Sequence, residues 1–91
     1  MIQIPAALRA LTENRTRIEV DAKTVAEALQ GLVEMYPGIA RYIFDEHRRL
    51  RSFVNVFLND KDIRTLNGLD TPLKDSDHLI ILPAIAGGLD R

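Results

Sequence analysis

A single well-marked amphipathic helix, with short strand-like segments on both sides, leaves few folds open to this chain. Thr24 and Glu27 form a capping box, in which each side chain binds a backbone N–H at the start of a helix. Apolar residues then recur at three- and four-residue spacing as far as Tyr36, which gives the helix one apolar face. Pro37 and Gly38 end the pattern, because proline cannot continue the helical hydrogen-bond ladder. We therefore expect one main helix with one buried side.

Alternating apolar and polar residues predict strands before and after that helix. The segments 1–4 and 15–20 precede it, and we expect them to form an antiparallel pair. Residues 53–58 form the best-marked strand, a short strand is expected at Ile63, and residues 78–82 form the last strand. This order favours an α+β fold in which one helix covers one face of a small mixed sheet, and the β-grasp is its compact form. The first and last strands would then lie side by side in the middle of the sheet.

Composition argues against several classes of function. The 91 residues include 12 Lys and Arg against 13 Asp and Glu, a formal net charge of -1, whereas proteins that bind a phosphate backbone carry excess positive charge on one face. Cysteine is absent, which excludes disulfides, thiolate zinc sites and a cysteine nucleophile. No segment approaches the ~20 apolar residues of a spanning helix, and no signal-peptide pattern is present. We expect one cytoplasmic domain that binds neither nucleic acid nor membrane.

No catalytic or metal-binding motif stands out in the sequence. Phosphate-binding loops, the zinc-binding helix motif and the nucleophile elbow are missing, and His47 and His78 stand alone. The carboxylates of Asp75 and Asp77 fit a turn that binds its own amides better than a cation site. The basic run over residues 48–51 is expected to be a solvated loop, with docking to an acidic partner as the alternative. We therefore expect no catalytic site, no metal and no bound cofactor.

The carboxyl-terminal stretch is the unusual part of the chain. It reads Pro83-Ala84-Ile85-Ala86-Gly87-Gly88-Leu89-Asp90-Arg91. Two glycines after a strand are typical of a frayed terminus. They also fit a delivery arm, because residues 84–88 would reach about 16–18 Å when extended and glycine enters slots too narrow for other residues. We divide the chain into a β-grasp domain over residues 1–83 and a flexible arm over residues 84–91.

Two segments, residues 51–60 and 79–88, resemble a known family. They read Arg51-Ser52-Phe53-Val54-Asn55-Val56-Phe57-Leu58-Asn59-Asp60 and Leu79-Ile80-Ile81-Leu82-Pro83-Ala84-Ile85-Ala86-Gly87-Gly88. Strand, proline, small apolar arm and glycine pair follow in the order found in ubiquitin-like sulfur carriers of the MoaD and ThiS type. The chain looks closest to the carrier of the protein-thiocarboxylate route to cysteine. The turn over residues 73–77 resembles the family's L-x-D-G-D motif with Ser76 in place of glycine, which would cost about 1 kcal/mol if a positive φ were needed there.

The resemblance implies a mechanism in which the chain itself catalyses nothing. A ubiquitin-activating-type enzyme would use ATP to adenylate Gly88, and a sulfur donor would displace AMP to leave a thiocarboxylate. Gly87 would give the arm access to the enzyme. In the cysteine branch, a cysteine synthase-like enzyme with its own pyridoxal phosphate would accept the sulfur. ATP and pyridoxal phosphate thus belong to partner enzymes.

Three residues follow the glycine pair, whereas mature members of the family end there. With Leu89 attached, Gly88 has no free carboxylate and cannot be adenylated. We therefore expect a proprotein that a JAMM-type peptidase cuts between Gly88 and Leu89. The alternative is that Leu89, Asp90 and Arg91 are a remnant without function.

Strand alternation also indicates a docking patch near the arm. Phe57, Ile80 and Leu82 are expected to point away from the helix-covered face, on neighbouring strands. Isolated exposed apolar residues are common and need no explanation. An aromatic residue beside two branched aliphatic residues at the base of an arm nevertheless favours a docking surface for the activating enzyme.

Three classes of function remain open. The first is a sulfur carrier for biosynthesis, and the second is a ubiquitin-like modifier joined through Gly88 to lysines on target proteins. The third is a β-grasp interaction subunit in which the glycines are incidental. Within the carrier class, synthesis of cysteine, molybdopterin and thiamine and thiolation of tRNA use the same kind of arm. The small subunit of molybdopterin synthase is therefore a further alternative.

Overall fold

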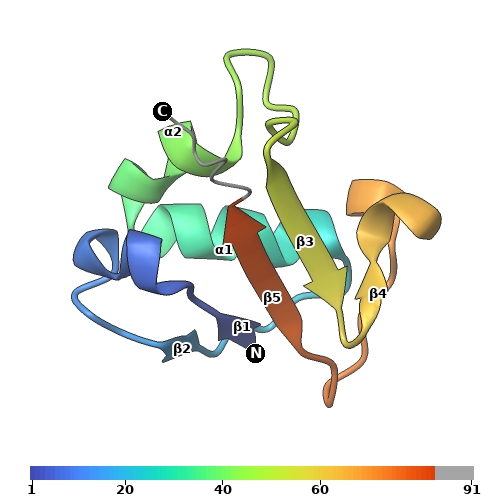
Figure 1. Ribbon diagram of the computed structural model, residues 1–91. Coiled ribbons are helices and arrows are strands. Elements are labelled where there is room, and N and C mark those ends of the chain that lie inside the picture. The colour runs from blue at the N-terminus through green and yellow to red at the C-terminus, as the bar shows by residue number, and fades with distance from the viewer. Residues whose placement is uncertain (84–91) are drawn as a thin grey trace.

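A computed structural model describes residues 1–83, which form a five-stranded sheet with one main helix packed on one face (Figure 1). The strands and α-helices are β1 (Ile2–Gln3), β2 (Arg17–Ile18), α1 (Val25–Met35), α2 (Ala40–Ile43), β3 (Val54–Leu58), β4 (Lys61–Asp62) and β5 (Leu79–Pro83). Short 3₁₀ turns are η1 (Ala6–Leu11), η2 (Pro37–Ile39), η3 (Ile63–Thr65) and η4 (Gly68–Asp70).

The sheet is mixed, and its last strand lies in the middle. The strand order is β2-β1-β5-β3-β4. β1 runs antiparallel to β2 and parallel to β5, and β5 runs antiparallel to β3 over five residue pairs, from Leu79 opposite Leu58 to Pro83 opposite Val54. With α1 connecting β2 to β3 across one face, this is the expected β-grasp arrangement. The predicted central position of the first and last strands is confirmed.

The main helix begins and ends where the sequence predicts. The Thr24 hydroxyl accepts a hydrogen bond from the Glu27 N–H at 3.2 Å, and the Glu27 carboxylate accepts one from the Lys23 N–H at 3.2 Å. The helix ends at Met35, and Pro37 starts a 3₁₀ turn. The Thr24 side chain thus satisfies one N–H group of the first helical turn, while Glu27 reaches the residue before the N-cap instead of the Thr24 N–H that a capping box predicts.

The core lies between α1 and the sheet face that it covers. α1 contributes Val25, Ala28, Leu29 and Leu32, all fully buried. From the sheet, one inward row contains Ile18, Ile2 and Leu79, which are neighbours on adjacent strands. The next row contains Val56 and Ile81. Burial of each large side chain contributes roughly 1.5–3 kcal/mol, so this layer fixes the position of β5.

Three local expectations differ from the structure. The strand expected over residues 15–20 is only Arg17–Ile18, because its partner β1 is also two residues long. Ile63 lies in η3 rather than in a strand: the Asp62 carboxylate accepts the Arg64 N–H at 2.9 Å and turns the chain. Ser76 is not among the residues with a positive φ, so the turn carries no such strain there.

The described part of the chain contains no helix of membrane-spanning length and apolarity. Within the same residues, no three His, Asp or Glu side chains come together as metal ligands. The predicted arm, residues 84–91, lies outside the described residues.

Candidate functional site

The sheet face opposite α1 presents a row of side chains that crosses all five strands. The row contains, in spatial order, Arg17, Gln3, Ile80, Phe57 and Asp62. All five are partly or fully exposed, whereas their immediate chain neighbours Ile2, Ile18 and Leu79 are buried on the other face. The alternation expected of strands half-covered by a helix is thus present across the sheet.

The structure brings Phe57, Ile80 and Leu82 together on this uncovered face. Phe57 lies directly opposite Ile80 in the β3–β5 pair, and Leu82 lies two residues further along β5, opposite Asn55. Phe57 and Ile80 are half-buried, and Leu82 is 45% exposed. Directly opposed and diagonal side chains of an antiparallel pair are within contact range. We call these three residues the sheet patch; its docking role stays a prediction.

A further exposed aromatic residue lies just before β3. Phe53 is expected from the sequence to be part of that strand, but it lies in the preceding turn, outside the β3–β5 pairs, and is 46% exposed. The guanidinium carbon of Arg51 lies 6.0 Å from the centre of the Phe53 ring, at the outer limit of a cation–π contact. Phe53 is therefore not counted in the sheet patch.

The amino end of β3 is held by a contact that no sequence pattern indicated. β4 ends at Asp62, so within the described residues no strand covers the outer edge of β3 at its amino end. The Arg64 guanidinium lies there instead: it donates to the Val54 carbonyl at 2.7 Å and to the Asn55 side-chain oxygen at 2.5 Å. The other edge of the same β3 segment pairs with Leu82 and Pro83. Arg64 therefore braces the part of β3 that pairs with the end of β5.

The opposite end of β5 is fixed by a turn that is hydrogen-bonded to itself and to Asn59 of the β3–β4 loop. The Asp77 carboxylate accepts the Lys74 N–H at 2.8 Å and the Asn59 side-chain amide at 3.2 Å. The Lys74 hydrogen bond, followed by the Asn59 hydrogen bond, holds the pKa of Asp77 below its ordinary value. Asn59 also accepts the His78 N–H at 3.1 Å. The prediction that Asp77 serves a turn that binds its own amides agrees with these contacts.

Two carboxylates in surface loops have lowered pKa values. A hydrogen bond from the Arg49 N–H holds the pKa of Asp45 below its ordinary value, and one from the Lys74 N–H does the same for Asp77. His47 and His78 are exposed, as expected. The residues predicted to carry sulfur or to be cleaved, Gly87, Gly88 and Leu89, lie outside the described residues.

Comparison with known proteins places this arrangement in a family. The model of the ThiS family matches residues 2–88, which is nearly the whole chain and ends at Gly88. The chain belongs to the ThiS family. The resemblance drawn from the strand, proline and glycine pattern is thereby confirmed.

Three ThiS-like relatives show how closely the chain resembles known proteins. The sulfur carrier protein CysO of Mycobacterium tuberculosis (strain ATCC 25618 / H37Rv) is 35% identical over 89 residues, which cover 96% of both chains. A chain of the crystal structure of the Amycolatopsis orientalis BexX/CysO complex is 38% identical, with a TM-score of 0.88 over 96% of this chain and 97% of that one. Small archaeal modifier protein 3 of Haloferax volcanii is 33% identical over 72 residues, 79% of this chain and 76% of that protein. Relatives of the ThiS-family chain thus include both named sulfur carriers and a named modifier.

Proposed function

We propose that this ThiS-family chain is a sulfur carrier that holds sulfur as a thiocarboxylate on Gly88. The observation that carries the proposal is the position of Leu82, which belongs to the sheet patch and also precedes Pro83 at the end of β5. A partner that covers the patch therefore lies beside the base of the arm. Gly88 follows Pro83 by five residues, a reach of roughly 16–18 Å when extended.

The activation chemistry requires a free carboxylate at Gly88. One carboxylate oxygen attacks the α-phosphorus of ATP, which forms the glycyl adenylate and releases pyrophosphate. A sulfur nucleophile then attacks the carbonyl carbon, AMP leaves, and the sulfur remains as a thiocarboxylate. The chain supplies the acyl group and no catalytic side chain. In this proposal, ATP is bound by a ubiquitin-activating-type enzyme. The reaction takes place in the cytoplasm.

The three residues after Gly88 must leave before this chemistry can start. The Gly88–Leu89 bond is an amide, so residue 88 has no carboxylate to attack ATP. A JAMM-type peptidase would add water across that bond and release Leu89, Asp90 and Arg91 as a tripeptide. The match of the family model as far as Gly88 supports this cleavage position.

The deciding experiment compares the full chain with a chain that ends at Gly88. Each is incubated with ATP, the activating enzyme and sulfide, and its intact mass is measured. We expect the mass change of an oxygen-to-sulfur exchange only in the chain that ends at Gly88. Equal conversion of the two chains would contradict the hypothesis that the chain is a proprotein. If neither chain is converted, the carrier function itself is contradicted.

The similarities favour cysteine as the product into which the sulfur is transferred. The 35% identity to CysO over 96% of the chain supports this branch over synthesis of molybdopterin or thiamine. The thiocarboxylate sulfur would attack an activated serine derivative held on the pyridoxal phosphate of a cysteine synthase-like enzyme. The test mixes the thiocarboxylated chain with that enzyme and the serine derivative, and we expect cysteine attached to Gly88 before its release. Transfer only to a molybdopterin precursor would assign the chain to that pathway instead.

Conjugation to lysines is a second candidate function, and the similarity to small archaeal modifier protein 3 favours it. Isolation of covalent adducts from cells separates the two functions, because a carrier yields few or none. A Gly88→Val variant should abolish both functions but leave a simple interaction subunit unaffected. Gly38→Ala is the matched glycine control, because a Cβ there would lie 3.6 Å from the Leu11 side chain, an ordinary contact.

A further inference from the structure

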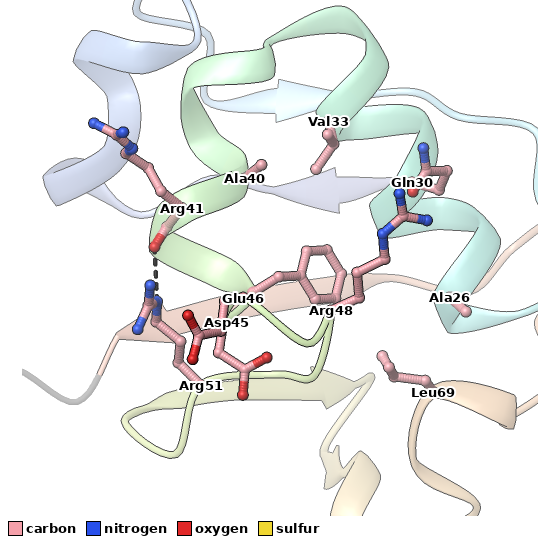
Figure 2. Close-up of a pocket in the computed structure, with 11 residues that line it drawn as sticks. Ala26, Gln30, Val33, Ala40, Arg41, Asp45, Glu46, Arg48, Arg51 and Leu69 are labelled. Carbon is pink, nitrogen blue, oxygen red and sulfur yellow. Dashed lines mark hydrogen bonds between the residues drawn. The ribbon is translucent and has the colours of Figure 1, made fainter.

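A groove of about 700 Å³ lies between the exposed flank of α1, α2 and the loop over residues 44–51 (Figure 2). Its apolar floor is formed by Ala26, Val33, Ala40, Phe44 and Leu69. It shares no residue with the sheet patch, because α1 packs on the sheet face opposite that patch (Figure 1). The groove is therefore a second surface that the proposed carrier function does not use.

Two arginines mark opposite sides of the groove. Figure 2 shows Arg48 beside Gln30 on one side and Arg51 on the other, with the carboxylates of Asp45 and Glu46 beside Arg51. The Arg51 Nε donates to the Arg41 carbonyl at 2.7 Å, which fixes the guanidinium and leaves its two terminal nitrogens to other partners. Neither Arg48 nor Arg51 forms an ion pair with any of the residues that the structure describes.

Two carboxylates, Asp45 and Glu46, also line the groove. Asp45 accepts the N–H groups of His47 at 2.8 Å and Arg49 at 2.9 Å, and its second oxygen lies 3.4 Å from the Arg49 Nε, so this carboxylate is used within its own loop. Glu46 is 87% exposed, and its one ion-pair contact is with His47 at 3.5 Å, which is a charge pair only when the imidazole is protonated. Among the described residues, the lining charges left to a ligand are therefore Arg41, Arg48 and Arg51 against Glu46, a positive balance.

The backbone at Arg48 belongs to a tight turn. Its φ is +63°, in the left-handed region that glycine adopts without strain. The Arg48 N–H donates to the Asp45 carbonyl at 3.0 Å, and the Asp45 N–H donates to the Arg49 carbonyl at 2.8 Å. These two hydrogen bonds hold Arg48 at the rim of the groove.

We propose that this groove binds an acidic amphipathic peptide segment of a partner protein. Its apolar side chains would occupy the floor between α1 and Phe44, and its carboxylates would pair with Arg48 and Arg51. A groove of this size holds only two or three anchoring side chains, so the segment is short. Because the groove and the sheet patch lie on different faces, such a partner would stay bound while the activating enzyme holds the patch and the arm.

The test is a titration of the ¹⁵N-labelled full chain with the acetylated and amidated peptide Glu-Leu-Glu-Glu-Leu-Phe-Glu-Glu-Leu. We expect saturable amide shifts at Gln30, Phe44 and Leu69, with Phe57 and Ile80 unchanged. A peptide with Lys in place of every Glu is the matched probe and should not bind. Binding should weaken as salt is added, because exposed charges are screened.

Charge-reversal variants decide whether the arginines carry the binding. Arg48→Glu should weaken binding of the acidic peptide roughly fivefold to tenfold. Arg17→Glu makes the same charge change on the uncovered sheet face and should leave the affinity unchanged. Equal affinities of the two variants, no saturable shift in the groove, or preference for the lysine peptide would each overturn the proposal.

Two other occupants would also overturn it, and each has its own measurement. If sedimentation shows that the full chain forms a dimer that Arg48→Glu dissociates, the groove is an interface between copies of this chain. If Asp90→Lys alone shifts the amides of Gln30 and Leu69, the chain's own carboxyl-terminal segment occupies the groove. We expect a monomer and unchanged groove amides in these two experiments.

Discussion

Phe57 and Ile80 face one another across the β3–β5 pair, on the sheet face that α1 leaves uncovered. On the same two strands, Leu58 and Leu79 form the next pair and point toward the core side. The pleat thus separates residues that hold the fold from residues available to a partner. A substitution at Phe57 should therefore affect partner binding more than folding.

Phe57→Glu should weaken binding of the activating enzyme by at least about tenfold, because interface aromatics are frequent centres of binding energy. Binding is measured by calorimetry on the chain that ends at Gly88, and folding is checked by thermal unfolding. Tyr42→Glu is the matched control, since Tyr42 is 48% exposed and lies in α2, away from the sheet patch. Unchanged binding of a folded Phe57→Glu variant would remove Phe57 from the docking surface.

Arg64→Met should lower the free energy of unfolding by about 1 kcal/mol. The guanidinium makes charge-assisted hydrogen bonds to β3, but its side chain is 45% exposed, so water screens part of their strength. Arg64→Lys should not restore the loss, because an ammonium cannot reproduce the planar fork. Urea denaturation measures both variants. Full stability of Arg64→Lys would show that charge alone accounts for the contact.

Asp77→Asn should make the free energy of unfolding less dependent on pH in the acidic range. The pKa of Asp77 is lowered in the folded chain, so this carboxylate stabilises the fold above the ordinary value of 3.8, and that contribution disappears as the pH falls through its folded pKa. The variant should therefore be less stable than the native chain at pH 7, and the gap should close in acid. Asp75→Asn is the control on the same turn. A gap that stays constant across the pH range would show that Asp77 acts through packing.

Arg48→Gly should raise the free energy of unfolding by about 0.5 kcal/mol. Relief of the left-handed strain gains about 1 kcal/mol, and the greater freedom of glycine in the unfolded chain cancels part of that gain. The same variant should bind the acidic peptide less well, so stability and binding would move in opposite directions. A stability loss on urea denaturation would show that the Arg48 side chain supports the loop.

Local patterns in the sequence predicted the elements that local forces determine. The capping box at Thr24 and Glu27 located the start of α1, and Pro37 located its end, because both act on neighbouring backbone groups. Alternation placed Phe57, Ile80 and Leu82 on one sheet face, because side-chain direction depends only on parity along a strand. The β-grasp topology then followed from the order of these elements.

Features that depend on contacts distant in sequence escaped prediction. Arg64 reaches Val54 across ten residues only because β4 stops at Asp62, and no periodicity in the sequence marks that stop. The groove likewise exists because the loop over residues 44–51 packs beside the flank of α1. The basic run was expected to be solvated; Arg48 and Arg49 are exposed, but Arg51 is half-buried. The position of Arg48 and Arg51 at the groove depends on the folded backbone.

The place of β5 between β1 and β3 has a consequence for how the protein is made. Without β5, the β1–β2 pair and the β3–β4 pair share no ladder and would remain two separate hairpins. A polypeptide that stops short of residue 79 on the ribosome therefore lacks the strand that joins the two pairs, and it lacks Ile80 and Leu82 of the sheet patch. The two halves of the sheet can be joined only after the last strand has been synthesised.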